Sequence, residues 1–433
     1  MTAKAGPGVE RESVRTYFAL PGFRWLLYCR FAASWSDGMF RAGLAGAVLF
    51  NPERAADPLT IAGGFATLLL PYSLIGPFAG ALLDRWDRRR VLVVANLLRA
   101  LAILATVLAL SAGVNGAGLF SLALLVEGVA RFAGSGMSAA LPHLVPPTCL
   151  VGANAAATTL GAMVAVFGGG CAIVLRALFG ADDAGSALTT SFAFAGPVLA
   201  ALIAARFARG SLGPSTVDEP ADAVLAVARG LTDGARVAAR TPSVLAGFAA
   251  LFAHRAAYAV SLLLSVLLMR FSFTDLGLLQ AGLPGLGQLA LLAGAGILLA
   301  GFRTAWLIRR FGRTRVVLGA LLLAALAQLG LGLPMTLPTT LAASFLITAA
   351  GQVLKLGVDS AIQRDVEDAA RGRVFALYDT LFNLTMVAAV SAAAALTPPD
   401  GRSPPLLLAA TACYLLGGLG YLIVLRRRPA GDL

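Results

Sequence analysis

Charge is scarce in this sequence. Only 13% of its 433 residues are Asp, Glu, Lys or Arg, whereas soluble domains carry about 25%. Lysine is almost missing, because Lys4 and Lys355 are the only two, so nearly all of the positive charge is arginine. Hydrophobic residues make up 58%, and the mean hydropathy is +0.82. This much apolar side chain exceeds what a water-soluble core of this length can enclose, which indicates a membrane protein.

Patterns typical of several other protein classes are also missing. The four cysteines are scattered, with no CxxC pair and no metal-ligand spacing, so we expect no metal and no cofactor. The net charge of +12 lies in short arginine clusters between apolar runs, which argues against a nucleic-acid partner. Ala, Leu and Gly dominate over aromatic residues, which favours packed helices over a β-barrel. No cleavable signal peptide is expected, because residues 1–22 are polar and contain two prolines.

Twelve apolar stretches are long enough to cross a bilayer, which requires about 20 residues each. The expected spans are residues 24–50, 59–82, 91–112, 117–140, 152–178, 187–206, 243–270, 280–303, 316–336, 339–358, 374–397 and 404–425. Arginine-rich loops alternate with short loops that carry acidic residues. By the positive-inside rule, both termini and the long central loop lie in the cytoplasm. Abundant Ala, Gly and Arg suggest a bacterial source, so we expect a multi-pass protein of the bacterial inner membrane.

Residues 207–242 form the one substantial break between spans. Apolar positions within 221–240 recur as in an amphipathic helix that lies on the cytoplasmic membrane surface. A partly disordered linker is the alternative. The predicted organisation is a cytoplasmic tail at 1–22, a six-helix bundle at 23–206, the linker at 207–242, a second six-helix bundle at 243–425 and a cytoplasmic tail at 426–433.

A repeated loop supports the division into two halves. Residues 80–90 read GALLDRWDRRR, and residues 305–315 read AWLIRRFGRTR. Each loop lies between the second and third span of its half, with basic residues at matching offsets. Internal duplication of this kind is typical of transporters that are built from repeated helix bundles.

The first loop resembles the signature Gly-x-x-x-Asp-Arg-x-x-Arg-Arg of the major facilitator superfamily. The matching residues are Gly80, Asp84, Arg85, Arg88 and Arg89. A basic loop that only sets topology would explain the arginines but not Gly80 or Asp84 at these offsets. The second loop departs from the signature, because Arg309 stands where the first loop has Asp84.

Shorter strings at 34–38, 132–142, 153–155 and 371–375 resemble the branch of macrolide-efflux and enterobactin-exporter proteins. The resemblance implies an all-α membrane protein of twelve transmembrane helices in two pseudo-symmetric six-helix bundles. It also implies that helices 1, 4, 7 and 10 line a central cavity, and that the first loop acts as a conformational latch.

Ionisable and polar side chains inside spans are candidates for proton coupling or for the substrate cavity, because a charge at mid-membrane costs about 3 kcal/mol unless it is paired or hydrated. The candidates are Arg30, Asp37, Arg41, Glu127, Arg131, His254, Arg255, Lys355, Asp359, Asp379 and Asn383.

Two of these acids each precede an arginine by four residues, which suggests ion pairs within a helix, Asp37 with Arg41 and Glu127 with Arg131. These pairs are either static supports for packing or the proton-coupling site, for which we favour Asp37 and Glu127. Several other candidates have a simpler interpretation. Arg30, Lys355 and Asp379 could lie near span ends, and His254 could be an ordinary hydrogen-bonded helix residue.

The sequence predicts a secondary active transporter and not an enzyme. We expect a monomeric, proton-driven exporter of an amphipathic small molecule, such as a drug, siderophore or lipid-like metabolite. Its partners would be that substrate and the lipid bilayer. A flippase for lysophospholipids or envelope lipids and an importer of an organic anion remain alternatives. A membrane glycosyltransferase is remote, because the acidic pair Asp182 and Asp183 lies in a short, late loop. The sequence has no filter-like loop of a channel.

Asp84 is the residue of the latch that can be tested most directly. Near the positive N-terminus of span 11, around 372–375, its carboxylate would gain about 0.5–2 kcal/mol from the helix dipole and charge-assisted hydrogen bonds. Asp84→Asn should therefore leave membrane insertion intact but slow turnover in proteoliposomes. A normal transport rate in the inserted variant would contradict the latch.

Overall fold

The computed structural model describes residues 18–49, 58–74, 86–146, 150–213 and 223–426, and these residues form a bundle of helices. Ten of the described helices are long and apolar enough to cross a membrane. The chain is therefore a multi-pass, all-α membrane protein, as predicted. The ten do not include the first two expected spans, because α2 contains Arg30, Asp37 and Arg41 and α3 is described over only 17 residues.

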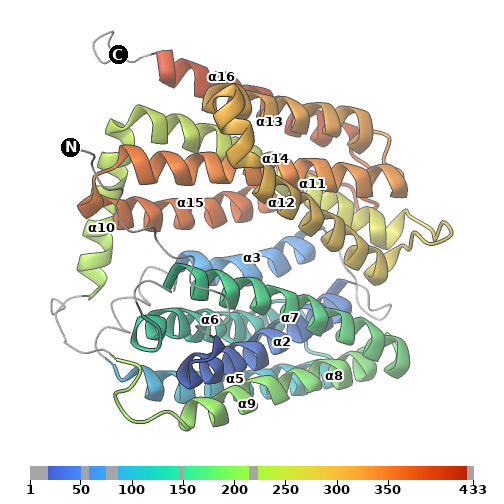
Figure 1. The fold of residues 1–433 in the computed structure, drawn as a ribbon. Coiled ribbons are helices and arrows are strands. Elements are labelled where there is room, and N and C mark those ends of the chain that lie inside the picture. Colours follow the sequence, from blue (N-terminus) through green and yellow to red (C-terminus); the bar gives the residue numbers. More distant parts are fainter. Residues whose placement is uncertain (1–17, 50–57, 75–85, 147–149, 214–222, 427–433) are drawn as a thin grey trace, which may run out of the picture.

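The helices fall into two sets on either side of α10 (Ala223–Arg240). The first set is α2 (Pro21–Leu49), α3 (Pro58–Leu74), α5 (Arg88–Ser111), α6 (Ala117–Ala140), α7 (Leu150–Phe179), and α8 (Asp183–Ser191) continued by α9 (Ala195–Ala205). The second set is α11 (Pro242–Phe271), α12 (Gly282–Phe311), α13 (Arg313–Ala327), α14 (Leu337–Asp365), α15 (Asp368–Ala394) and α16 (Pro404–Arg426). Figure 1 places the two sets in separate layers, with α3 between them.

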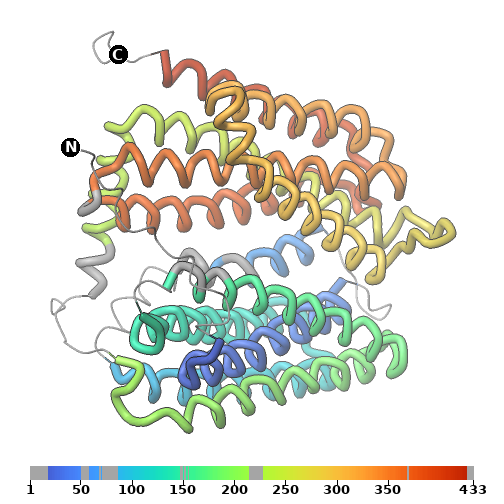
Figure 2. The backbone as a smooth tube through the Cα atoms, in the orientation of Figure 1, coloured from blue at the N-terminus to red at the C-terminus, as the bar shows by residue number. Residues whose placement is uncertain are grey.

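Several helices extend further than their apolar stretches predicted. Helix α12, which Figure 2 shows as one continuous helix, reaches Phe311 instead of ending at 303. Helix α14 continues to Asp365 instead of 358, and α15 begins at Asp368 instead of 374. The reason is that an apolar stretch ends at the first charges, whereas arginine side chains reach toward the headgroups while the backbone stays helical. The latch site expected at the N-terminus of span 11, residues 372–375, therefore lies inside α15.

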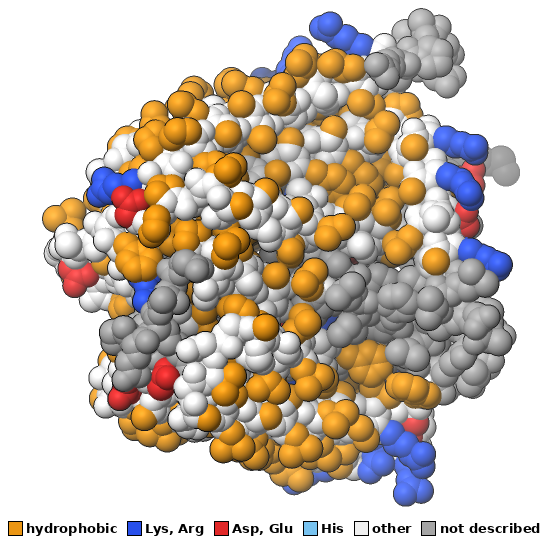
Figure 3. Space-filling view, turned by 180° about the vertical axis from the view of Figure 1, so that it is seen from behind, with side chains coloured by type: hydrophobic (Ala, Val, Ile, Leu, Met, Phe, Trp, Pro, Cys, Tyr) orange, Lys and Arg blue, Asp and Glu red, His pale blue; other side chains and the backbone are white. Residues whose placement is uncertain are grey.

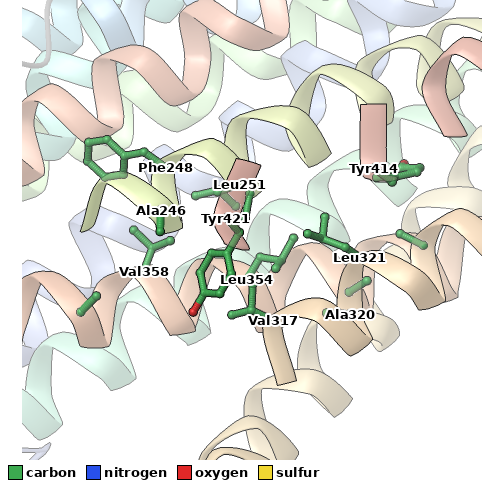
Figure 4. Close-up of a cluster of buried hydrophobic side chains, with 14 of the residues drawn as sticks. Ala246, Phe248, Leu251, Val317, Ala320, Leu321, Leu354, Val358, Tyr414 and Tyr421 are labelled. Atoms are coloured by element: carbon green, nitrogen blue, oxygen red, sulfur yellow. The ribbon is translucent and has the colours of Figure 1, made fainter. Parts of the chain in front are cut away.

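The core of the second set joins α11, α13, α14, α15 and α16, together with Ala238 of α10, through small and large apolar side chains. Ala246 and Leu251 of α11 lie against Val317 and Leu321 of α13 and Val358 of α14, while tyrosines of α16 close the cluster (Figure 4). The corresponding cores of the first set join α2 to α5, α6, α7 and α9. Each set thus has its own apolar interior.

Helices α2 and α7 approach each other closely at three glycines. A Cβ on Gly38 would overlap the carbonyl oxygen of Ala165, and one on Gly168 would overlap the carbonyl oxygen of Trp35. Gly169 lies beside them, within van der Waals reach of Ala42. Small residues allow backbones to approach in a membrane, where van der Waals packing drives helix association. The glycines thus set the spacing of α2, which carries Asp37.

Among the described residues, contacts between the two sets gather at one end of the bundle. Ile61 and Ala62, near the start of α3, pack with Leu267 at the end of α11 and with Met386 and Val390 near the end of α15. Helices α7 and α12 also meet at this end, where Ile173 lies beside Gly287. The charge pattern of the loops predicts that this end faces outward.

The opposite end carries α10 and much of the arginine. Helix α10 packs along α15, and a Cβ on Gly234 would lie 2.6 Å from the carbonyl oxygen of Arg373. Asp233 of α10 also accepts a hydrogen bond from Arg373 at 3.3 Å. Figure 3 shows Lys and Arg side chains gathered along the right-hand edge and apolar side chains over much of the face between the ends.

The contact between α2 and α7 predicts how two neighbouring glycines respond to the same substitution. Gly168→Ala should destabilise the protein, because overpacking of this kind costs about 1–3 kcal/mol. Gly170→Ala is the matched control, because nothing lies within 4 Å of its Cβ. Thermal unfolding of the purified proteins in detergent should give a lower Tm for Gly168→Ala alone. Equal Tm values would show that α2 and α7 are not held as the structure places them.

Candidate functional site

A charged cavity of about 170 Å³ lies between α2, α5 and α6. Six ionisable side chains line it, namely Arg30, Asp37, Arg41, Arg99, Glu127 and Arg131. Four arginines against two acids give these side chains a formal net charge of +2. The remaining lining residues include Ser34, Gly134 and Met137, which are small or uncharged. The cavity is therefore polar and cationic.

Two ion pairs cross from α2 to its neighbours. Asp37 accepts a hydrogen bond from Arg99 of α5 at 2.5 Å. Glu127 of α6 accepts two hydrogen bonds from Arg41 of α2, at 3.0 and 2.7 Å, so this pair is bidentate. A bidentate arginine–carboxylate pair restricts the relative orientation of the two side chains more than a single hydrogen bond does. The two pairs together join α2, α5 and α6 around the cavity.

These partners correct the pairing that the sequence suggested. Spacing of four residues predicted Asp37 with Arg41 and Glu127 with Arg131, but each acid pairs with an arginine of another helix. The reason is that a residue four positions away lies on the same helix face, which is also the face toward the neighbouring helices. An arginine of a neighbouring helix can therefore point directly at the acid and pair with it, instead of the arginine on the acid's own helix.

The two pairs differ in how far they are exposed. Arg99 is 1% exposed and Asp37 25%, whereas Arg41 is 39% exposed and Glu127 only 1%. Arg99 is thus enclosed by protein and has no room to swing away. Arg41 lies at the cavity surface. The arginine is thus the enclosed member of the first pair and the exposed member of the second.

Arg30 and Arg131 complete the cationic wall. Arg30 makes no ion pair or hydrogen bond with any described residue. It interacts electrostatically with Asp37. Its guanidinium lies close to Gly161 of α7, whose Cβ position is 3.3 Å from Nε of Arg30. Arg131 lies within electrostatic range of Asp379 on α15, which belongs to the other helix set. The cavity wall therefore faces the second set.

A smaller group of charges lies on α14 and α15. Lys355 donates a hydrogen bond to Asp359 at 2.8 Å, one helical turn away, and its ammonium group lies 5.7 Å from the centre of the Tyr378 ring. Asp379 is exposed and lies within electrostatic range of both residues and of Arg131. The structure thus brings these three predicted residues together across from the cationic wall.

Arg255 of α11 is held by aromatic rings. Its guanidinium carbon lies 4.0 Å from the centre of the Phe382 ring and 5.7 Å from that of Tyr258. No described residue forms an ion pair or hydrogen bond with it, and its buried Nε has no partner. Stacking of arginine on aromatic faces is favourable, and it leaves the N–H groups free to bind an anion.

Two other candidates lie away from the cavity. His254 is 4% exposed, and its Nε2 lies 3.0 Å from the carbonyl oxygen of Ile347, so it joins α11 to α14. Asn383 is 9% exposed and donates to the carbonyl oxygen of Asp379 in its own helix. Both side chains have the ordinary role of a hydrogen-bonded helix residue.

The signature loop is described only in part, because Gly80, Asp84 and Arg85 lie outside the described residues. Arg88 is 7% exposed and donates to the carbonyl oxygens of Ala139 at 2.9 Å and Leu212 at 3.3 Å. Arg89 donates to the carbonyl oxygen of Ala205 at 2.8 Å. Both arginines therefore hold the ends of α5, α6 and α9 together within the first set.

Sequence reasoning missed Arg99, although a signal was present. Arg99 is the one charged residue in the middle of the apolar run 91–112, which is the pattern that singled out the other candidates. The aromatic partners of Arg255 carried no comparable signal, because aromatic residues in apolar spans are common core residues. Among the described residues, no group of three or more His, Cys, Asp or Glu could hold a metal ion.

Comparisons with known proteins agree on one family. The sequence pattern of the Major Facilitator Superfamily matches residues 26–390. A protein of Mycobacterium tuberculosis named as an uncharacterized MFS-type transporter is 43% identical over 419 residues, covering 95% of this chain and 93% of that protein. A crystal structure of the nucleoside transporter NupG has a TM-score of 0.71 at 10% identity, covering 93% of this chain and 99% of that one. A peptide transporter of the POT type has a TM-score of 0.71 at 16% identity, covering 94% and 95%.

The buried pair Asp37–Arg99 predicts a non-additive effect on stability. Asp37→Asn should destabilise the protein by about 3–5 kcal/mol, because it leaves the enclosed Arg99 without its partner, and Arg99→Gln should cost less, because Asp37 is 25% exposed. The double variant should recover most of this loss. Thermal unfolding of the four proteins in detergent measures the coupling. Additive losses in the double variant would mean that the two side chains do not depend on each other.

Proposed function

Because this chain belongs to the major facilitator superfamily, we propose that it is a secondary active transporter that works by alternating access and exports an amphipathic organic anion in exchange for protons. The observation that carries the proposal is Arg30, which lines the central cavity and makes no ion pair or hydrogen bond with any described residue. An anionic group of a substrate would supply its partner. Arg255, stacked on Phe382, offers an apolar and cationic surface on the opposite side.

The contacts between the two helix sets support alternating access. They gather at one end of the bundle and consist of apolar side chains, such as Ile61 against Val390. Apolar contacts of this kind can separate and reform without leaving a charge unpaired. With this end outward, as the loop charges predict, these contacts would close the central cavity to the outside.

Glu127 is the best candidate for the proton site. It is 1% exposed, so it cannot remain charged without a cation, and its partner Arg41 is at the cavity surface. Pairing with Arg41 and protonation of Glu127 exclude each other, so uptake or loss of a proton at Glu127 would change the charge of the cavity wall. Asp37, paired with the enclosed Arg99, is better suited to a fixed structural role.

The direction of transport is proposed from the sequence. The strings at 34–38, 132–142, 153–155 and 371–375 resemble exporters, and an exchange of an anion for protons suits a cell that maintains an inward proton gradient. An importer of the same anion would use the same cavity, so the orientation of transport has to be part of the test.

The test is uptake into proteoliposomes of defined protein orientation, with and without a proton gradient. Probes would be radiolabelled amphipathic anions, namely taurocholate, an aryl sulfonate and a lysophosphatidic acid, and the amphipathic cation tetraphenylphosphonium as the control. We expect saturable, gradient-dependent movement of at least one anion and none of the cation. Glu127→Gln should lose the dependence on the gradient, and Arg30→Gln should raise KM. Transport of the cation alone, or gradient dependence that survives in Glu127→Gln, would refute the proposal.

A further inference from the structure

A second arginine-lined surface lies far from the central cavity. The extension of α12 to Phe311 forms a groove with α13 and α14, of about 700 Å³. Apolar side chains line most of it, among them Leu299, Trp306 and Leu323, which are 48%, 48% and 41% exposed. The neighbouring face of α12 is more exposed still, with Phe302 at 83%. A groove with such apolar walls faces hydrocarbon and not water.

Arg303 is a charged residue among the mostly apolar residues that line this groove. It is an exposed residue of α12 that makes no ion pair or hydrogen bond with any described residue. Eight residues separate it from Phe311 at the helix end, which places it about 12 Å deeper along the axis at 1.5 Å per residue. An arginine at this depth needs an anionic partner or a route to the headgroups.

The rim of the groove has the composition of a lipid headgroup site. Arg315 of α13 lines the groove as a second exposed cation without a described partner. Trp306 and Phe311 contact each other edge to face, with ring centres 6.1 Å apart. Aromatic rings of this kind lie at the level of the headgroups. No acidic residue is among the lining residues, so the groove is complementary in charge to a phosphate.

The equivalent groove of the first helix set differs in charge. It lies between α5 and α6, has a volume of about 870 Å³ and carries Trp86 and Arg90 at the positions that match Phe311 and Arg315 in the repeat. Its lining also includes Asp87, which offsets Arg90. The residue that matches Arg303 in the repeat is Phe78. The two grooves thus have similar volumes, but among the described lining residues only the second has an excess of positive charge.

We propose that the groove between α12, α13 and α14 binds one anionic phospholipid of the leaflet on the side of α10. Its phosphate lies between Arg303 and Arg315, and an acyl chain runs along Leu299 and Val353 toward the membrane centre. Trp306 packs against the glycerol region. The lipid supplies the counter-charge that no described residue gives to Arg303. This site is independent of the transported substrate, so it does not depend on the proposed function.

Tryptophan fluorescence can test the site, because the two grooves each contain one tryptophan. In the full-length protein, Trp25 and Trp35 are replaced by Phe, and either Trp306 or Trp86 is kept as the single reporter. Each protein is reconstituted in phosphatidylcholine vesicles that contain the same fraction of either brominated phosphatidylglycerol or brominated phosphatidylcholine. Bromine quenches the tryptophan that the labelled lipid contacts. Circular dichroism and size-exclusion chromatography check that each variant is folded.

We expect the quenching of Trp306 to favour phosphatidylglycerol, with a preference of roughly fivefold for each arginine near the surface. Trp86 should show no comparable preference. Arg303→Gln with Arg315→Gln should abolish the preference at Trp306, the double replacement by Lys should keep part of it, and Arg90→Gln should leave it unchanged. Equal quenching of Trp306 by both lipids, or a preference that survives the double Gln replacement, would overturn the proposal and leave ordinary annular lipid in the groove.

Discussion

A charged side chain in the bilayer interior needs either a partner of opposite charge or access to water. The arrangement of the first helix set follows from this constraint. The long arginine side chain can span the distance of about 8–10 Å between packed helices. Arg99 reaches from α5 to Asp37, and Arg41 reaches from α2 to Glu127. Because each pair joins two helices, it fixes how they are rotated about their axes as well as neutralising a charge. The cavity between α2, α5 and α6 exists because these rotations place the charges on its walls.

Packing of the backbone makes this arrangement rigid. Gly38 and Gly168 bring α2 and α7 so close that neither position has room for a Cβ, and Gly196 does the same between α2 and α9. Helix α2 is therefore held on one side by backbone contact and on the other by ion pairs. The contact between the two helix sets is of a different kind, because it is made by apolar side chains near the ends of α3, α11 and α15. Movement between rigid sets is easier at such a contact than within either set.

Arginine has distinct roles in the different parts of this molecule. In the central cavity it pairs with acids or remains available for an anion, and at the ends of α5 and α9 it binds backbone carbonyl groups. In the groove of α12 it lies among apolar and aromatic side chains. A planar guanidinium suits all of these settings, because it can bind carboxylates or phosphates with two N–H groups and stack on rings. The scarcity of lysine is consistent with these demands, and Lys355 pairs with Asp359 of its own helix.

The sequence by itself determined the membrane class, the family and, through its apolar stretches, nearly every helix. It did so because a segment in hydrocarbon must be both apolar and helical, so length and composition are sufficient evidence. Charge within the spans also identified most of the candidate site, including Asp37, Glu127 and Arg131. Helix ends such as Phe311 and Asp365 were predicted less well, because an arginine near the headgroups ends an apolar stretch without ending the helix. Only the tertiary structure decided which arginine meets which acid, that Arg99 lines the cavity and that His254 is buried between α11 and α14. The physical reason is that these outcomes depend on the rotation and spacing of neighbouring helices, which are set by contacts such as that of Gly168 with Trp35 and are not encoded in the composition of any single span.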